Sequence, residues 1–144
     1  MSGIDRGDFM KKKVCVFLFP IAALILELLP YGAVLNFGYP AEDGTMIYSR
    51  ATYSYFDLTP YGYANFSPFL TAMLTCALLL FAVIFCIRGK IIFLRISRVL
   101  TGIAVFTSIM PLFFGIEVYS AIGLAITILF LIEFIYLVRN LRQG

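Results

Sequence analysis

The chain has 144 residues and a net charge of +3; 62% of the residues are hydrophobic and 13% are charged. Soluble domains are about 45–50% apolar and about 25% charged, and a short chain has too little interior to hide such an excess. This composition excludes a soluble enzyme, a disordered tail and a nucleic-acid-binding module, and it predicts an integral membrane protein in contact with the lipid bilayer.

Several chemistries are missing from the sequence. It contains no His, so it offers no imidazole as a general base, as a partner for a nucleophilic Ser or as a metal ligand. The three cysteines, at positions 15, 76 and 86, have no zinc-site spacing. We therefore expect no cofactor and no metal, and we identify no catalytic residue.

Four apolar runs are predicted to be transmembrane helices: residues 14–35, 68–88, 96–114 and 118–138. Each run is about 19–22 residues long, which is enough for a helix to cross a hydrocarbon core of about 30 Å. Strands of a membrane barrel alternate apolar and polar residues, and these runs do not. The predicted fold is therefore an all-α bundle of four transmembrane helices.

The first run has an alternative interpretation as a signal peptide, because lysines precede it. Glu27 interrupts the run, however, and residues 31–33 make a poor cleavage site. We expect the segment to be retained as the first span.

The basic residues predict the orientation. If the spans alternate, all but one of the eleven Lys and Arg residues fall on one side of the membrane. The positive-inside rule then places residues 1–13, the connection at 89–95 and the tail at 139–144 in the cytoplasm. The sequence thus predicts a multi-pass protein, which we assign to the plasma membrane, with a tight outer turn at 115–117.

The outer segment between the first two spans, residues 36–67, is unusually rich in Tyr. Alternating β-favouring residues predict a short strand pair with a turn near Arg50. Such a segment is either an aromatic cap on the bundle or a recognition surface for a protein, carbohydrate or small ligand. The candidate recognition residues are Tyr31, Tyr39, Tyr48, Tyr53, Tyr55, Tyr61, Tyr63, Arg50 and Asp57.

A short pattern occurs at both ends of this segment. The sequence PYG at residues 30–32, followed by Asn36 and Phe37, recurs at residues 60–62, followed by Asn65 and Phe66. We interpret the two copies as similar turns at the membrane interface.

Two carboxylates, Glu27 and Glu133, form a candidate intramembrane polar site. A charge at the centre of a membrane costs about 2.5–3.5 kcal/mol. Glu133 is expected to pair with a cytoplasmic arginine. Glu27 has three open alternatives, namely a bond to the loop tyrosines, an ion pair with Arg50, or protonation with a proton- or ligand-linked role.

The second connection and its flanks are basic and apolar together. They act either as a topology anchor or as contacts for anionic lipid headgroups. The residues concerned are Arg88, Lys90, Arg95 and Arg98.

Small residues recur at helical spacing in the last two spans, and small side chains let membrane helices approach closely. We predict that these faces pack against each other within one chain, with a homodimer seam as the alternative. They comprise Thr101, Ala104 and Ser108, and Ser120, Gly123 and Thr127.

The leading functional hypothesis is a non-catalytic accessory or interaction protein that uses its outer aromatic loop to bind a membrane-protein partner or a second copy. The alternative is a small transporter or ligand-binding component in which Glu27 lies beneath the tyrosines. A membrane enzyme that uses Asp57 and Glu27 as an acid–base pair ranks third, because nothing in the sequence sets their separation.

Overall fold

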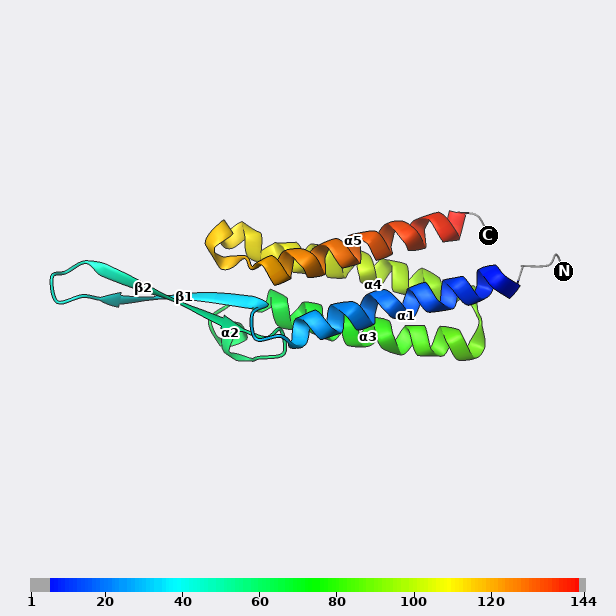
Figure 1. Ribbon diagram of the computed structural model, residues 1–144, viewed down its shortest axis with the longest axis horizontal. Coiled ribbons are helices and arrows are strands. Elements are labelled where there is room, and N and C mark those ends of the chain that lie inside the picture. Colours follow the sequence, from blue (N-terminus) through cyan, green and yellow to red (C-terminus); the bar gives the residue numbers. More distant parts are fainter. Residues whose placement is uncertain (1–5, 143–144) are drawn as a thin grey trace.

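Four long helices run side by side in the computed structural model, which describes residues 6–142 (Figure 1). They are α1 (Arg6–Leu28), α3 (Ser67–Arg88), α4 (Ile91–Ile109) and α5 (Ala121–Arg142). Residues 1–5 of the predicted N-terminal segment and residues 143–144 of the predicted tail lie outside the described residues. The start of α1 and the end of α5 lie at the same end of the bundle (Figure 1).

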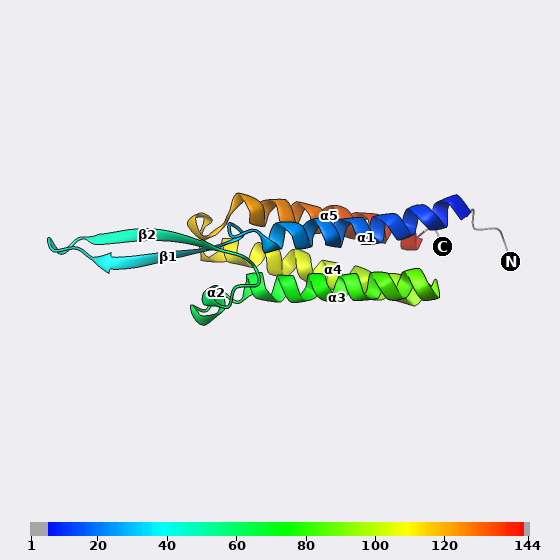
Figure 2. The same cartoon turned by 60° about the horizontal axis from the view of Figure 1, so that its bottom comes forward.

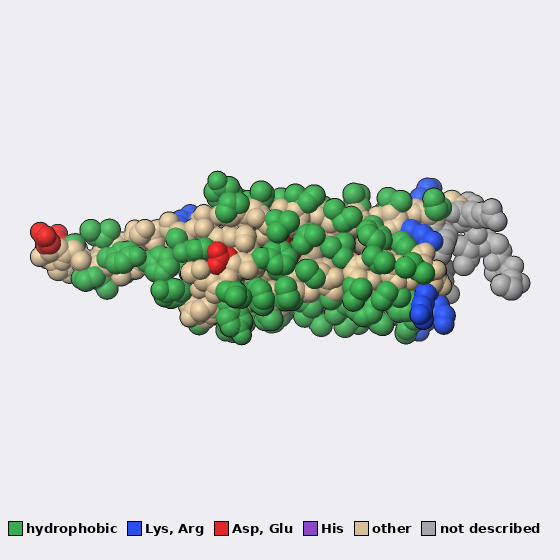
Figure 3. All heavy atoms as spheres, turned by 90° about the horizontal axis from the view of Figure 1, so that it is seen from below, with side chains coloured by type: hydrophobic (Ala, Val, Ile, Leu, Met, Phe, Trp, Pro, Cys, Tyr) green, Lys and Arg blue, Asp and Glu red, His purple; other side chains and the backbone are tan. Residues whose placement is uncertain are grey.

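Three of these helical segments are long and apolar enough to cross a membrane: Ser67–Arg88, Ile91–Phe114 and Ala121–Leu141. Hydrophobic side chains cover most of the bundle surface seen in Figure 3. A surface of this kind is stable against lipid and unstable against water. The helices therefore identify a membrane protein.

Helix α1 differs from the predicted first span at both ends. It begins at Arg6 and ends at Leu28, whereas residues 33–35, predicted as the end of the span, begin strand β1 (Ala33–Pro40). Pro30 accounts for the early end, because proline lacks a backbone N–H and disfavours helix at the preceding residue. α1 also contains three lysines and Glu27, so it is more charged than the three apolar helices.

The outer segment forms a long antiparallel hairpin that projects beyond the bundle (Figures 1 and 2). Strand β1 pairs with β2 (Met46–Tyr53), and Asn36 lies opposite Arg50. The predicted turn near Arg50 is wrong, because Arg50 lies within β2. The chain reverses instead at Asp43, whose Oδ1 accepts hydrogen bonds from the backbone N–H and the hydroxyl of Thr45, and at Gly44, which has a φ of +81°.

A short helix, α2 (Thr59–Gly62), precedes α3 and lies near its start (Figure 2). Asp57 Oδ1 accepts a 2.8 Å hydrogen bond from the Thr59 N–H at the beginning of this helix. Asp57 therefore orders the local backbone. Ala64, just after α2, has a left-handed backbone with a φ of 64°.

The α3–α4 connection is shorter than predicted, and the outer α4–α5 connection is longer than the predicted turn at 115–117. Only Gly89 and Lys90 separate α3 from α4, and Gly89 closes α3 in a left-handed conformation with a φ of 64°. α4 thus includes residues 91–95, which were predicted as part of the connection. At the outer end, the 3₁₀ helices η1 (Met110–Phe114) and η2 (Ile116–Val118) link α4 to α5; η1 takes up the end of the predicted third span, and α5 begins later than the predicted fourth.

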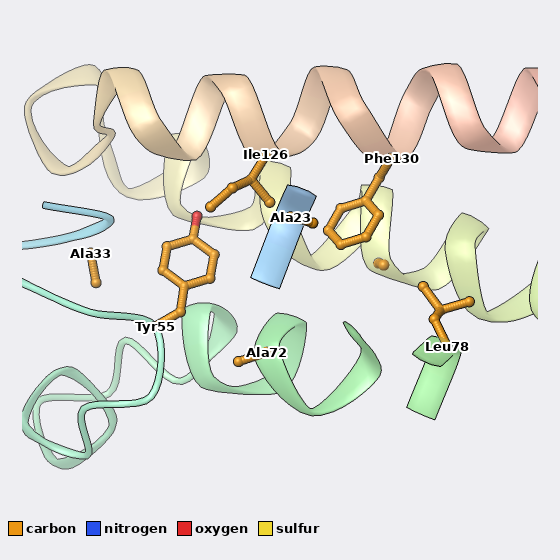
Figure 4. Close-up of a cluster of buried hydrophobic side chains, with 8 residues drawn as sticks. Ala23, Ala33, Tyr55, Ala72, Leu78, Ile126 and Phe130 are labelled. Atoms are coloured by element: carbon orange, nitrogen blue, oxygen red, sulfur yellow. The ribbon is translucent and has the colours of Figure 1, made fainter. Parts of the chain in front are cut away.

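Two buried clusters lie between the helices, one at the outer half of the bundle and one, around Phe85 and Leu137, toward the basic end. Figure 4 shows the Tyr55 ring between α3 and α5, near Ala72 and Ile126. The two predicted small-residue faces are buried, and Thr127 Oγ1 donates a 3.0 Å hydrogen bond to Ser108 Oγ. The two faces therefore meet within one chain at Thr127 and Ser108, whereas Ser120 bonds to the Gly32 carbonyl and Gly123 lies against the Tyr55 hydroxyl.

Candidate functional site

The predicted recognition tyrosines occupy several different places. Tyr39 and Tyr48 are exposed on the hairpin, whereas Tyr61 and Tyr63 are exposed on and just after α2. Tyr31 is exposed between α1 and β1. The tyrosines therefore do not form one surface.

Tyr55 belongs to the core and is not a recognition residue. Its side chain is 1% exposed and packs against Gly32, where an added Cβ would lie 2.8 Å from Tyr55 Cδ1. Its backbone N–H donates a 2.9 Å hydrogen bond to the Glu27 carbonyl. Burial raises the pKa of the Tyr55 phenol, and the nearby charges of Tyr119 and Glu27 raise it further. Tyr55 thus attaches the chain after the hairpin to the end of α1.

The outer half of the hairpin exposes large apolar side chains next to an acidic turn. Tyr48 is 73% exposed, and Tyr39, Met46 and Ile47 are also exposed. The acidic side chains of Glu42 and Asp43 lie at the tip, at the far end of the molecule from most of the basic residues (Figure 3). We call Tyr39, Met46, Ile47 and Tyr48 the apolar tip. Met46 and Ile47 were not among the predicted recognition residues, although an apolar stretch beside a turn is the sequence signal that indicates them.

Glu27 is buried and bonds to α3. Thr75 Oγ1 donates a 2.6 Å hydrogen bond to Glu27 Oε1, while Oε2 has no hydrogen-bond partner among the described residues. Neither predicted partner, a loop tyrosine hydroxyl or Arg50, makes this contact. Asp57 bonds to the start of α2, and the structure gives no contact between the two carboxylates of the suggested acid–base pair.

Threonine and serine hydroxyls connect the interiors of three helices around this point. Thr75 also bonds to the Thr71 carbonyl, and Thr71 Oγ1 donates to Thr107 Oγ1 across the α3–α4 interface at 2.9 Å. Between α4 and α5, Thr127 bonds to Ser108, and Tyr119 OH lies 2.6 Å from Thr127 Oγ1. Hydroxyls at four-residue spacing, such as Thr71 and Thr75, were the sequence signal for this network.

Glu133 lies on α5 deeper in the bundle. Its side chain is 0% exposed, and neither carboxyl oxygen has a hydrogen-bond partner among the described residues. The predicted pairing with Arg88, Arg95 or Arg98 is therefore wrong. Arg88 and Arg95 are exposed and Arg98 is half-buried, whereas Glu133 is enclosed. An unpaired buried carboxyl is costly unless it is protonated or meets a polar partner.

The predicted lipid-contacting residues surround the α3–α4 connection. Arg88, Lys90 and Arg95 are exposed, and Arg98 is half-buried. Lys13 of α1 lies at the same end, where its Nζ donates a 2.9 Å hydrogen bond to the Cys86 carbonyl. This end of the bundle is basic, and the described residues contain no group of three or more His, Cys, Asp or Glu side chains that could hold a metal ion.

Two cavities lie beside the hairpin, one at its base and one that extends along it to Tyr48, and they share Asn36. The first, of about 210 Å³, lies between β1, the segment after α2 and the η1–η2 turn, and it is lined by Leu35, Asn36, Tyr63, Ala64, Asn65, Phe114 and Val118. The second, of about 230 Å³, is lined by Asn36, Tyr48, Arg50 and Glu117. The two asparagines of the repeated sequence pattern therefore meet at one cavity.

No protein-family model, curated protein or solved structure matches this chain.

Proposed function

We propose that this protein is a non-catalytic membrane protein with four spans that recognises a partner protein through the apolar tip of its outer hairpin. One observation carries the proposal: the hairpin extends away from the bundle and exposes four large apolar side chains (Figures 1 and 3).

The proposal includes α1 as the fourth membrane-spanning helix. Helix α1 lies along α3 and α5, which are both apolar enough to cross a membrane (Figure 1). Lys13 reaches the Cys86 carbonyl near the end of α3, as expected of a lysine near the membrane surface. These contacts support the proposal that α1 crosses the membrane packed against α3 and α5.

The orientation follows from charge. Most of the basic residues lie at the end opposite the hairpin (Figure 3), and the positive-inside rule assigns that end to the cytoplasm. The hairpin then faces outward from what we propose to be the plasma membrane, where a partner's extracytoplasmic surface is accessible.

The hairpin itself has the properties of a binding element. An isolated two-stranded ribbon is marginally stable in water, and its outer strand edges are available for pairing. Covering the exposed apolar side chains with a partner removes their surface from water, which favours binding. Glu42 and Asp43 beside the apolar tip favour a partner with an apolar surface bordered by basic side chains.

Site-specific crosslinking in native membranes tests this proposal. A photoreactive amino acid at Ile47 or Tyr48 is expected to give a discrete protein adduct. The matched control is Ile132 of α5, which is exposed on the bundle and should give lipid adducts. An adduct pattern at the tip identical to that at Ile132 would remove the recognition function.

A transport or proton-linked function is the second candidate, supported by the burial of Glu27 and Glu133 inside the bundle. Neither cavity beside the hairpin is lined by Glu27. Proton-driven uptake into proteoliposomes that is lost in Glu27→Gln would favour this candidate over recognition.

A further inference from the structure

The cavity between β1 and the η1–η2 turn contains an unused hydrogen-bond donor. Asn65 lines this cavity and is 6% exposed. Its Oδ1 accepts a 3.2 Å hydrogen bond from Ser67 Oγ, whereas its buried Nδ2 has no partner among the described residues. This nitrogen is enclosed by surrounding protein atoms, and a buried amide nitrogen without a partner costs free energy. A rotation of the Asn65 side chain toward the cavity would let it donate to an acceptor brought by a ligand.

The other walls are mainly apolar. Hydrocarbon surface comes from Leu35, Phe114 and Val118. Tyr63 contributes an aromatic ring that packs edge-on against Phe37, with 5.2 Å between the two ring centroids. A volume of about 210 Å³ holds a small group rather than a whole lipid or a large metabolite. The cavity therefore fits a compact group that has an acceptor oxygen and an apolar continuation.

The cavity lies at the level where candidate membrane spans end, and this position indicates which class of ligand can reach it. Asn65 lies two residues before α3, and Phe114 ends the apolar segment Ile91–Phe114, so both lie where candidate spans end. Phe113, Phe114 and Ile116 are exposed beside the cavity. Apolar side chains exposed at this level suit contact with acyl chains.

We infer that this cavity binds the ester region of an outer-leaflet glycerophospholipid. An ester carbonyl accepts a hydrogen bond from Asn65 Nδ2, and the attached acyl chain lies along Phe114 and Val118. The neighbouring cavity carries Arg50 and Glu117, which have charges complementary to a zwitterionic phosphate–amine headgroup. The cavity at Asn65 contains no residue of the apolar tip, whereas the neighbouring cavity shares Tyr48 with it. The ester contact at Asn65 is therefore tested independently of partner recognition by Tyr39, Met46 and Ile47.

Native mass spectrometry of the full chain in detergent tests the inference with two probes. One is dioleoyl phosphatidylethanolamine, and the other is its dioleyl ether analogue, which has the same headgroup and chain length but lacks both ester carbonyls. The wild-type chain is expected to bind the ester lipid about tenfold more tightly, which corresponds to one hydrogen bond of ordinary strength.

Variants assign this preference to the cavity. Asn65→Leu keeps a side chain of similar size without a donor, so it should bind both lipids equally weakly. Val118→Phe fills the cavity from another wall and should lose both lipids. Asn140→Leu is the matched control. It makes the same substitution near the end of α5, far along the helix from the cavity, and should behave as the wild type.

Three results would contradict ester-lipid binding at this cavity. Equal binding of ester and ether lipids by the wild-type chain overturns the inference, because the carbonyl would then make no contact. An ester preference that persists in Asn65→Leu, or binding that persists in Val118→Phe, places the lipid elsewhere and also overturns it. The wild-type comparison needs no substitution, so it stands even if a variant fails to fold.

Discussion

The hydroxyl of Thr75 on α3 donates a 2.6 Å hydrogen bond to the carboxyl of Glu27 on α1. Both side chains are fully buried, and α1 is the most charged of the four long helices. This bond therefore provides a polar attachment between a helix that carries charges and a neighbour that is apolar enough to span the membrane by itself.

Replacing Thr75 by Val is expected to destabilise the bundle by about 1–3 kcal/mol, because the Glu27 carboxyl is left without its donor. Unfolding by denaturing detergent in mixed micelles measures this change. The control is Thr101→Val, since Thr101 bonds only to the Ser97 carbonyl of its own helix. Equal effects of the two substitutions would contradict a specific role for the Thr75–Glu27 bond.

The two buried carboxyls, Glu27 and Glu133, should respond differently to replacement by Leu. Glu133→Leu removes an enclosed carboxyl that has no hydrogen-bond partner within residues 6–142, so stability should rise by about 1–3 kcal/mol. Glu27→Leu removes the hydrogen-bond acceptor of Thr75 and should lower the stability of the bundle. The same detergent assay checks both variants.

A gain in stability of Glu133→Leu accompanied by a loss of function would identify Glu133 as a functional carboxyl, because active groups are commonly kept at the expense of stability. A destabilised Glu133→Leu variant would instead show that the native state relies on this carboxyl.

The hairpin turn is expected to loosen in acid. Hydrogen bonds from the side chain and backbone of Thr45 lower the pKa of Asp43 below its ordinary value of 3.8. A lowered pKa means that the ionised form stabilises the turn above the ordinary value, and that this contribution is lost as the pH falls through the folded-state pKa.

Amide chemical shifts of Thr45 and Gly44, followed from pH 6 to pH 2, measure this transition. Asp43→Asn should abolish the titration while leaving the shifts of the helices unchanged. A Thr45 amide that does not respond to pH in the wild-type chain would contradict the role of Asp43.

Ala64→Gly is expected to stabilise the fold by about 0.5–1 kcal/mol. Ala64 has a φ of 64°, a conformation that is strained for an L-residue and free of strain for glycine. Ala125→Gly in the second turn of α5 is the control and should destabilise by about 1 kcal/mol. Thermal unfolding distinguishes the two directions, and destabilisation by Ala64→Gly would show that the Ala64 side chain makes contacts that outweigh the strain.

The proposed orientation predicts opposite accessibility at the two ends. In a variant without the three native cysteines, Ser49→Cys on β2 should react with a membrane-impermeant maleimide in intact cells. Lys90→Cys should react only after permeabilisation. The reverse pattern would invert the topology, and labelling of both sites in intact cells would contradict a membrane-spanning bundle.

The three apolar spans could be predicted from the sequence because each is a property of a continuous stretch of side chains. The run at residues 68–88 agrees with α3, Ser67–Arg88, to within one residue at its start. The small residues of the last two spans were equally informative, because a short connection forces neighbouring helices to pack.

The outer segment was less predictable, because its strands are set by pairing between distant residues. Arg50 was expected at a turn, but its position opposite Asn36 places it within β2. The cavity at Asn65 arises from segments around residues 36, 65 and 118, which no local pattern brings together.

That most of the chain lies in lipid could be predicted from the amino-acid sequence, because the apolar side chains stand in long continuous runs. Hydrophobicity is additive along such a run and needs no knowledge of the fold. Tertiary structure alone decided which polar groups are enclosed. Tyr55 joined the core instead of the outer surface, and Glu133 was enclosed without an arginine. Burial and hydrogen bonding depend on neighbours from other helices, so they emerge when the chain folds.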